Sequence, residues 1–252
     1  MSRIASTFRR LSKANQVAAI PYLPVGLPDV QTSRLLLPII GRQGADMIAL
    51  GTLSAMRSAA DGASLSTGAT LDDCLNIAAE ARRTNEVPLI LISLVADAQE
   101  YGFEGLSIHS AQAGIDALLI LDLSLSDFAV IAPICSAMGV DAIPVISPDI
   151  QAATLSQLTL ATGFVYCPVS QFSELTKANL KTQVAEATDL PLVIGIDAET
   201  LADLPLNTKL ADCVLARSGM SEILLSHPEY EVMLEVSDHV RVIQDSIVRA
   251  GW

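Results

Sequence analysis

The sequence predicts an α/β protein with the fold of a single (β/α)8 TIM barrel and a short N-terminal helix. The chain has 252 residues, close to the roughly 250 typical of one such barrel. Short apolar runs alternate eight times with longer amphipathic stretches, which is the pattern of parallel strands joined by crossover helices. No linker, charge block or low-complexity tract divides the chain, so we expect one domain over residues 1–252.

The eight apolar runs are four to six residues long and mostly apolar on both faces, as strands buried on both sides must be. They are Ala18–Leu23, Met47–Leu50, Leu89–Leu94, Ala117–Leu121, Ala142–Ile146, Phe164–Cys167, Leu192–Ile196 and Cys213–Ala216. Helical patterns between them include Leu71–Thr84, Ser126–Met138, Ile150–Ala161 and Glu174–Thr188. We expect the least regular structure at Asn207–Leu210 and His227–Val232.

A glycine-x-aspartate tripeptide stands directly before several of these runs, at Gly44–Asp46, Gly114–Asp116 and Gly139–Asp141. Glycine supplies the left-handed conformation that ends a helix, and the chain then enters the next strand. The repetition favours a closed barrel of similar units over an open doubly wound sheet.

Charge and composition exclude several classes of partner. The net charge is −13 and no basic cluster occurs, so we expect no nucleic-acid partner. No apolar stretch reaches the length of about 18 residues that a membrane span needs. Only 17% of the residues are charged, against about 25% in an average globular protein. This deficit predicts apolar surface that a second copy or another protein covers.

The N-terminal segment Met1–Leu11 contains three arginines but no continuous apolar stretch, so it is not a secretory signal. We interpret it as a helix that closes the bottom of the barrel, with an organelle transit peptide as the alternative. The cysteines lack metal-ligand spacing and predict free buried thiols of a reducing cytoplasm, not a zinc site. They are Cys74, Cys135, Cys167 and Cys213.

In a TIM barrel, chemistry takes place at the C-terminal ends of the strands and in the loops that follow. No histidine and no suitable lysine falls there, which argues against a Schiff-base aldolase. Oxygen ligands from Asp61, Asp122 and Asp197 would suit magnesium, but their loops lie at different parts of the rim. We therefore expect neither a metal ion nor a cofactor in this chain.

Several blocks resemble the tryptophan synthase α-subunit family. Ile20–Asp29 is similar to its first strand and loop, and Gly44–Gly51 to its second strand. Further similar blocks follow in the family's order at Ala60–Gly62, Gly114–Leu123, Thr162–Tyr166 and Thr188–Gly195. The resemblance extends from the first strand to about Gly219.

The resemblance implies a defined chemistry. Members of the family split indole-3-glycerol phosphate into indole and glyceraldehyde 3-phosphate. A glutamate ending the second strand and an aspartate in the next loop are the acid/base pair. Backbone amides of the loops after strands 6, 7 and 8 hold the phosphate, and indole passes to a pyridoxal-phosphate-dependent β subunit. The implied partners are thus a β-subunit-like protein and a small indole or phosphorylated ligand.

At the acid/base positions this chain departs from the family. Ala49 stands where the family has its glutamate, while the loop aspartate is retained as Asp61. The loop from Leu53 to Ser58 lacks the family's pattern. The segment between Asp61 and Thr70 is also shorter than in the family, by about two helical turns. Asp61 is therefore the candidate catalytic residue, with an ordinary Asp-Gly turn as the alternative.

The loops that hold phosphate in the family are also altered. The candidate ligand-binding residues there are Gly195, Asp197, Arg217, Ser218 and Gly219. Asp197 adds a charge that repels phosphate by roughly 1–4 kcal/mol. Arg217 either pairs with Asp197, which we favour, or binds an anion directly, and amides near Ser218 could assist.

Three residues are expected to support the site: Asp122, Ser93 and Tyr166. Asp122 follows the fourth strand, and we expect it to be a buried carboxylate bonded to loop amides. Ser93–Val95 replaces the family's tyrosine-asparagine-proline pattern.

Three functional hypotheses remain open, all for a protein of the cytoplasm. In the first, a diverged barrel has little or no lyase activity and is a pseudoenzyme or binds another small ligand. In the second, a degenerate α subunit has lost lyase activity but still docks on a β subunit and activates it. In the third, a working lyase of tryptophan biosynthesis uses Asp61.

Overall fold

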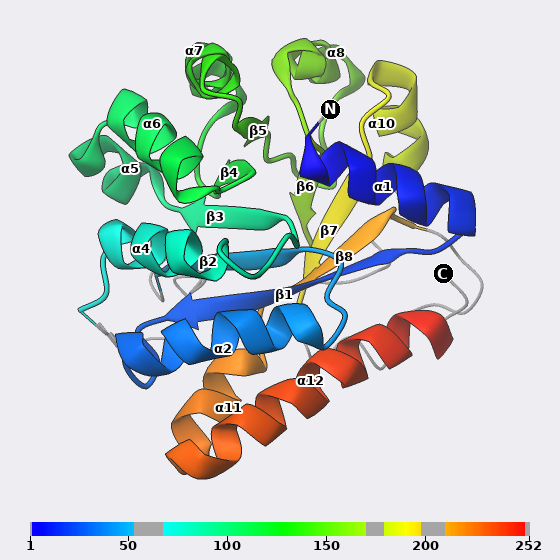
Figure 1. Cartoon of the computed structure of the whole chain (residues 1–252). Coiled ribbons are helices and arrows are strands. Elements are labelled where there is room, and N and C mark those ends of the chain that lie inside the picture. The colour runs from blue at the N-terminus through cyan, green and yellow to red at the C-terminus, as the bar shows by residue number, and fades with distance from the viewer. Residues whose placement is uncertain (1, 53–67, 170–178, 198–209, 250–252) are drawn as a thin grey trace.

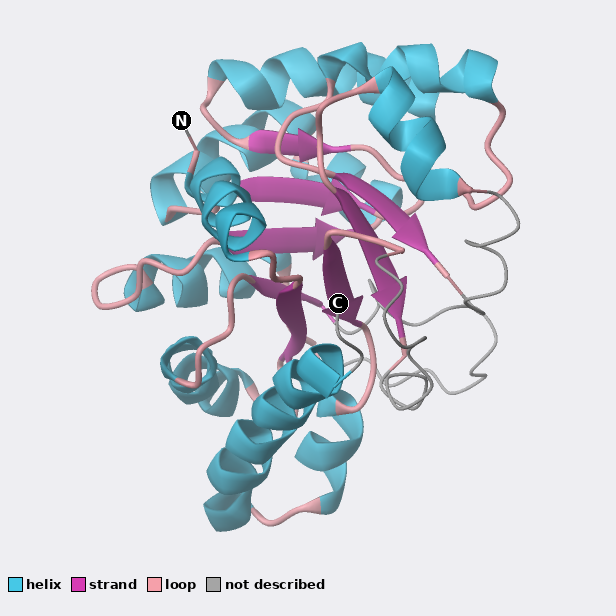
Figure 2. Cartoon of the chain, turned by 90° about the vertical axis from the view of Figure 1, so that its right-hand side faces the viewer, coloured by secondary structure: helices cyan, strands magenta, loops and turns pink. Residues whose placement is uncertain are grey.

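The computed structural model describes residues 2–52, 68–169, 179–197 and 210–249. Eight parallel strands form the centre, and each of the eight predicted apolar runs overlaps one of them. They are β1 Ala18–Val25, β2 Ile48–Thr52, β3 Leu89–Ser93, β4 Ala117–Ile120, β5 Asp141–Ile143, β6 Val165–Pro168, β7 Leu192–Ile196 and β8 Cys213–Ala216. Helices surround the strands, whose arrows run in a common sense from one end of the barrel to the other (Figure 2).

The strands pair in the order β5-β4-β3-β2-β1-β8-β7-β6 (Figure 1). The ring closes between β5 and β6 at a bridge between Val145 and Tyr166. There the Ile146 amide donates to the Tyr166 carbonyl at 2.8 Å, and the Tyr166 amide donates to the Pro144 carbonyl at 3.0 Å. The predicted TIM barrel is confirmed.

The helices lie outside the strands. They are α1 Arg3–Ala14, α2 Val30–Arg42, α4 Leu71–Ala81, α5 Val95–Tyr101, α6 Phe103–Ala113, α7 Leu125–Ala137, α8 Ala152–Leu155, α10 Leu180–Ala187, α11 Met220–Ser226 and α12 Glu229–Arg249, with a 3₁₀ helix at Ser156–Leu160. The predicted helix Ile150–Ala161 is thus two short pieces. Residues 174–178 of the predicted helix Glu174–Thr188 and residues 207–209 lie outside the described ranges. The irregular structure expected at His227–Val232 is wrong from Glu229 onward, because Pro228 precedes a helix, where its missing N–H costs nothing.

Helix α1 lies across the bottom of the barrel, as the sequence predicted. Ser2 caps it by accepting a hydrogen bond from the Ala5 amide at 3.2 Å. Its side chains Ile4, Phe8 and Leu11 are buried in the same apolar cluster as the barrel interior. The helix therefore supplies the lowest layer of the inner core.

Two of the three aspartates in the repeated tripeptide tie neighbouring strands together. Asp46 accepts a hydrogen bond from the Ala19 amide at 3.2 Å, and Asp116 accepts one from the Leu89 amide at 2.8 Å. Each carboxylate thus stands at the start of one strand and receives an amide from the start of its neighbour. The glycine before each aspartate has a positive φ, +90° at Gly44 and +76° at Gly114, as predicted.

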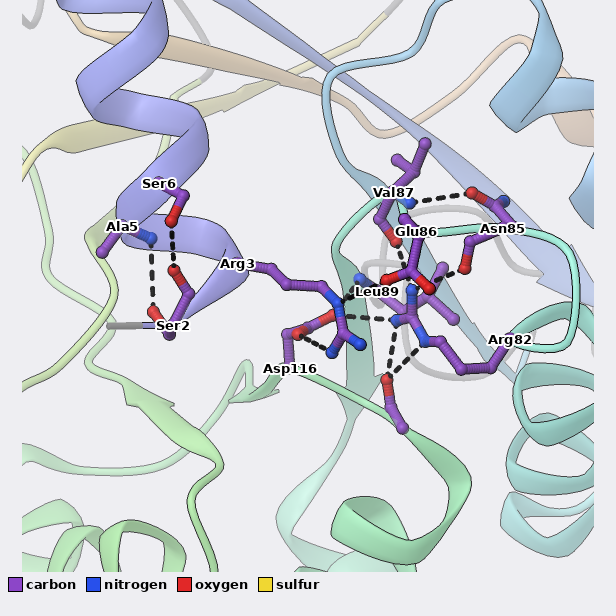
Figure 3. A network of polar contacts seen from close by, with 11 residues as sticks. Ser2, Arg3, Ala5, Ser6, Arg82, Asn85, Glu86, Val87, Leu89 and Asp116 are labelled. Carbon is purple, nitrogen blue, oxygen red and sulfur yellow. Dashed lines mark hydrogen bonds and ion pairs between the residues drawn. The ribbon is translucent and has the colours of Figure 1, made fainter.

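Asp116 also lies at the centre of a polar network at the bottom of the barrel (Figure 3). It forms ion pairs with Arg82 at 2.9 Å and with Arg3 of α1 at 3.1 Å. Arg82 donates further hydrogen bonds to the carbonyls of Gly114, Asn85 and Val87. These ion pairs and hydrogen bonds have a structural role, because they join α1 to the starts of β3 and β4.

Two other expectations concern burial. All four cysteines are buried and none forms a disulfide, as predicted, and burial raises the pKa of Cys74 to about 12. Among the described helices, none is both long and apolar enough to cross a membrane.

Candidate functional site

The candidate site lies at the C-terminal ends of the strands, where most of the predicted site residues are described. Asp61 is the exception, because it lies outside the described residues. The side chains at this end divide into an apolar floor, an ion pair and two residues that tie strand ends together.

Ala49 forms part of the apolar floor. It is fully buried in β2, opposite Tyr22 of β1 and Ile90 of β3. Tyr22 donates its hydroxyl hydrogen to the Thr52 carbonyl at 2.8 Å. Burial raises the pKa of Tyr22 well above its ordinary value, so this phenol stays neutral. Neither strand neighbour of Ala49 brings a carboxylate to the position of the missing glutamate.

Tyr166 of β6 is fully buried, and its ring lies against Gly195 of β7. A methyl group added at Gly195 would meet the Tyr166 hydroxyl at 1.9 Å, so only glycine fits here. No described residue is a hydrogen-bond partner of the hydroxyl, and burial raises its pKa. The absence of a side chain at Gly195 thus leaves room for the Tyr166 ring below the mouth of the barrel.

Arg217 and Asp197 form an ion pair at the mouth. The Arg217 Nη2 lies 3.1 Å from the Asp197 Oδ2 and also donates to the Val169 carbonyl at 3.3 Å. Side chains alternate along a strand, so Arg217 continues the inward series of Cys213 and Leu215. One guanidinium therefore connects the chain just after β6, β7 and β8. Of the two predicted roles for Arg217, pairing is what the structure shows.

Ser218 and Gly219 follow Arg217 and lead into α11. Gly219 has a φ of +90°, and its carbonyl accepts a hydrogen bond from the Ile223 amide at 3.2 Å. Their part in binding an anion stays a prediction.

Asp122 and Ser93 hold strand ends together. The Asp122 Oδ1 accepts a hydrogen bond from the Val95 amide at 2.7 Å, which ties the end of β4 to the start of α5. The Asp122 side chain is exposed, so the expectation of a buried carboxylate is wrong, although the expected bond to a loop amide is present. Ser93 is fully buried and donates to the Leu94 carbonyl at 3.1 Å.

A second polar group was not predicted. The Tyr101 hydroxyl donates to Asp72 at 2.7 Å and lies 2.8 Å from the Nδ1 of His109. Burial and the Asp72 hydrogen bond raise the pKa of Tyr101 to about 12. The three residues come from three helices, so no local pattern reveals them. Asp72 and Tyr101 line a cavity of about 390 Å³, and Asp97 and Glu100 line it as well.

In the described ranges, no three histidine, cysteine, aspartate or glutamate side chains gather closely enough to hold a metal ion.

Comparisons with known proteins agree with this architecture. The sequence pattern of the family described as tryptophan synthase alpha chain matches residues 8–241. The tryptophan synthase alpha chain of Chloroflexus aggregans is 32% identical over 241 residues, covering 89% of this chain and 90% of the relative. That of Chloroflexus aurantiacus is 30% identical over 266 aligned positions, covering 99% and 100%. The crystal structure of the Legionella pneumophila alpha chain superposes with a TM-score of 0.82 over 98% of each chain, at 22% identity.

The matched region continues past Gly219, where the resemblance was expected to end, and includes α11 and much of α12. These two helices have no distinctive motif, so their similarity is visible only in the full pattern. The chain belongs to the tryptophan synthase alpha chain family.

Proposed function

We propose that this protein is a diverged α-subunit-like barrel with little or no indole-3-glycerol-phosphate lyase activity, whose mouth binds a small ligand. The observation that carries the proposal is Ala49, which occupies a buried, inward position where the reaction needs a carboxylate. The four buried cysteines, none of which forms a disulfide, support a reducing cytoplasm as its location.

Cleaving the bond between indole and the glyceryl group needs two proton transfers. The indole carbon must gain a proton while the glyceryl hydroxyl loses one. Each well-placed acid or base typically contributes about 10²–10⁴-fold. The Ala49 methyl group can do neither. The phenols of Tyr22 and Tyr166 have raised pKa values and so do not act as bases near neutral pH. Asp61 would have to work alone.

We expect lyase turnover at least about 10²-fold below that of a competent α subunit, with or without a β subunit. The measurement is indole release from indole-3-glycerol phosphate by the unmodified protein and by Ala49→Glu, assayed side by side. A gain of activity in Ala49→Glu would identify the missing carboxylate as the main defect. Substantial activity in the unmodified protein would contradict the proposal and favour a working lyase using Asp61.

The second candidate function is docking on a β-subunit-like protein, or on a second copy of this chain. Exposed large apolar side chains favour it, and four of the ten among the described residues lie close together in sequence, near the junction of α11 and α12. They are Leu225, Tyr230, Met233 and Leu234. Contiguous apolar surface beyond a few hundred Å² often marks a contact with another protein.

We therefore expect the purified protein to form a homodimer or a stable complex with a β subunit. Sedimentation across a concentration series, with and without an added β subunit, measures this directly. If the protein stays monomeric at all concentrations and does not bind the β subunit, both forms of association are excluded. The low proportion of charged residues would then not be explained by association with another protein.

A further inference from the structure

Helix α12 carries an apolar stripe on the side that faces away from the barrel. Tyr230, Leu234 and Val248 are 81%, 64% and 75% exposed. The first two are about one helical turn apart and the third lies about four turns further on, so all three lie on one side of the helix over about 27 Å. The opposite side of α12 is buried through Val232, Val236, Val240, Ile243 and Ile247. The helix is thus apolar on two sides, and the described part of the chain covers one of them.

Two opposite charges lie midway along the stripe. Asp238 and Arg241 form an ion pair within α12 at 2.6 Å, and their side chains are 44% and 66% exposed. Each group can form further hydrogen bonds, because a carboxylate accepts several and a guanidinium donates several. The stripe therefore has apolar ends and a centre that holds one acid and one base.

The stripe is complementary to itself when a second copy runs in the opposite direction. A twofold axis that passes between Asp238 and Arg241 places each Asp238 opposite the Arg241 of the other copy. The same axis places Tyr230 of one copy beside Val248 of the other, because the two residues are at nearly the same distance from the axis. Twofold symmetry forms each of these contacts twice. A parallel arrangement would place like charges opposite each other, which is unfavourable.

We propose that this side of α12 is an interface between two copies of the chain, which pair with their α12 helices antiparallel. The inference rests on the second candidate function, docking through exposed apolar surface, and it names the partner as a second copy. Leu234 is covered in this arrangement by Val248 and by the aliphatic stem of Arg241 of the other copy. One helix from each copy buries less area than a standard interface, so we expect weak association, with a Kd of about 10 µM.

The first test is sedimentation of the full chain over a concentration range that extends well above and below about 10 µM. We expect a monomer–dimer equilibrium for the unmodified protein. Leu234→Gln removes apolar area from both copies and should weaken dimerisation about tenfold or more. Val130→Gln is the matched control, because Val130 is 69% exposed on α7, across the barrel from α12 (Figure 1). Dimerisation of this control should not change.

The second test exchanges the charges at the centre of the stripe. Arg241→Asp places a carboxylate opposite Asp238 of the other copy, and Asp238→Arg places two guanidinium groups opposite each other. Each variant alone should weaken dimerisation about tenfold or more. An equimolar mixture of the two should restore it, because every central contact between the copies then joins opposite charges. Arg83→Asp changes the net charge as Arg241→Asp does, on an exposed side chain just after α4, and should leave dimerisation unchanged.

A dimer that survives the α12 variants, or one that the mixture fails to restore, would overturn this inference and leave docking through other surface as the second candidate function. If the chain stays monomeric but binds a β subunit through α12, the partner named here is wrong and the second candidate function stands. A chain that neither dimerises nor binds a β subunit loses both. None of these results bears on lyase activity, which indole release measures separately.

Discussion

Replacing Asp116 by alanine is expected to lower the free energy of unfolding by about 3–5 kcal/mol, the usual cost of breaking a buried ion pair. The Asp116 side chain is only 6% exposed, and its Arg82 partner is 13% exposed. Burial lowers the pKa of Arg82, and the Asp116 charge opposes that shift. Without the carboxylate, a buried cation and the Leu89 amide lose a partner. Equilibrium unfolding in urea measures the change.

Arg3→Ala is the control for this experiment. Arg3 reaches the same carboxylate, but its side chain is 43% exposed and its other partner, Glu86, is 81% exposed. Exposed ion pairs contribute about 0–1 kcal/mol, so we expect a small loss. If Asp116→Ala cost no more than Arg3→Ala, the network at the bottom of the barrel would not be a major source of stability.

Gly195→Ala is expected to destabilise the protein by at least about 3 kcal/mol, the upper part of the range for overpacked cores. The new methyl group would lie 1.9 Å from the Tyr166 hydroxyl and 2.6 Å from the ring carbon that carries it. Tyr166 is fully buried, so its ring has no room to move away. Thermal or urea unfolding of the variant tests the expectation.

Two further variants make this result specific. Gly105→Ala in α6 adds a methyl group with nothing within 4 Å of it, and we expect it to stabilise the helix by about 0.5–1 kcal/mol. Tyr166→Phe removes a hydroxyl for which no described residue is a hydrogen-bond partner. Alone it should be nearly neutral, and it should partly rescue Gly195→Ala. A Gly195→Ala protein as stable as the parent would show that this close contact relaxes easily.

The barrel could be predicted from the sequence because its strands are buried on both faces and stand out as apolar runs. The prediction was less accurate where the backbone departs from regular pairing. The run Ala142–Ile146 yields a strand only from Asp141 to Ile143, because Pro144 has no N–H to donate to the ladder.

At the candidate site, chain position was enough to predict the Arg217–Asp197 pair, since both residues directly follow neighbouring strands. The Asp72–Tyr101 hydrogen bond could not be predicted in this way. It depends on how α4 and α5 each pack against α6, and neither helix carries a local signal for it. The exposure of Asp122 was likewise missed. The sequence places Asp122 after the fourth strand, but it does not say how deeply the side chain is buried.

Hydrogen bonding around the barrel is uneven, and this has a consequence for native-state dynamics. Between β5 and β6 the strands meet at one bridge, Val145 with Tyr166, whereas neighbouring strands elsewhere pair over several residues. Regions with few such bonds open at lower free energy than the whole protein unfolds. Amide protons of Ile146 and Tyr166 should therefore exchange with solvent through local opening, while those in the middle of β1 and β2 exchange only on complete unfolding. Such fluctuations would expose the buried Tyr166 hydroxyl to solvent.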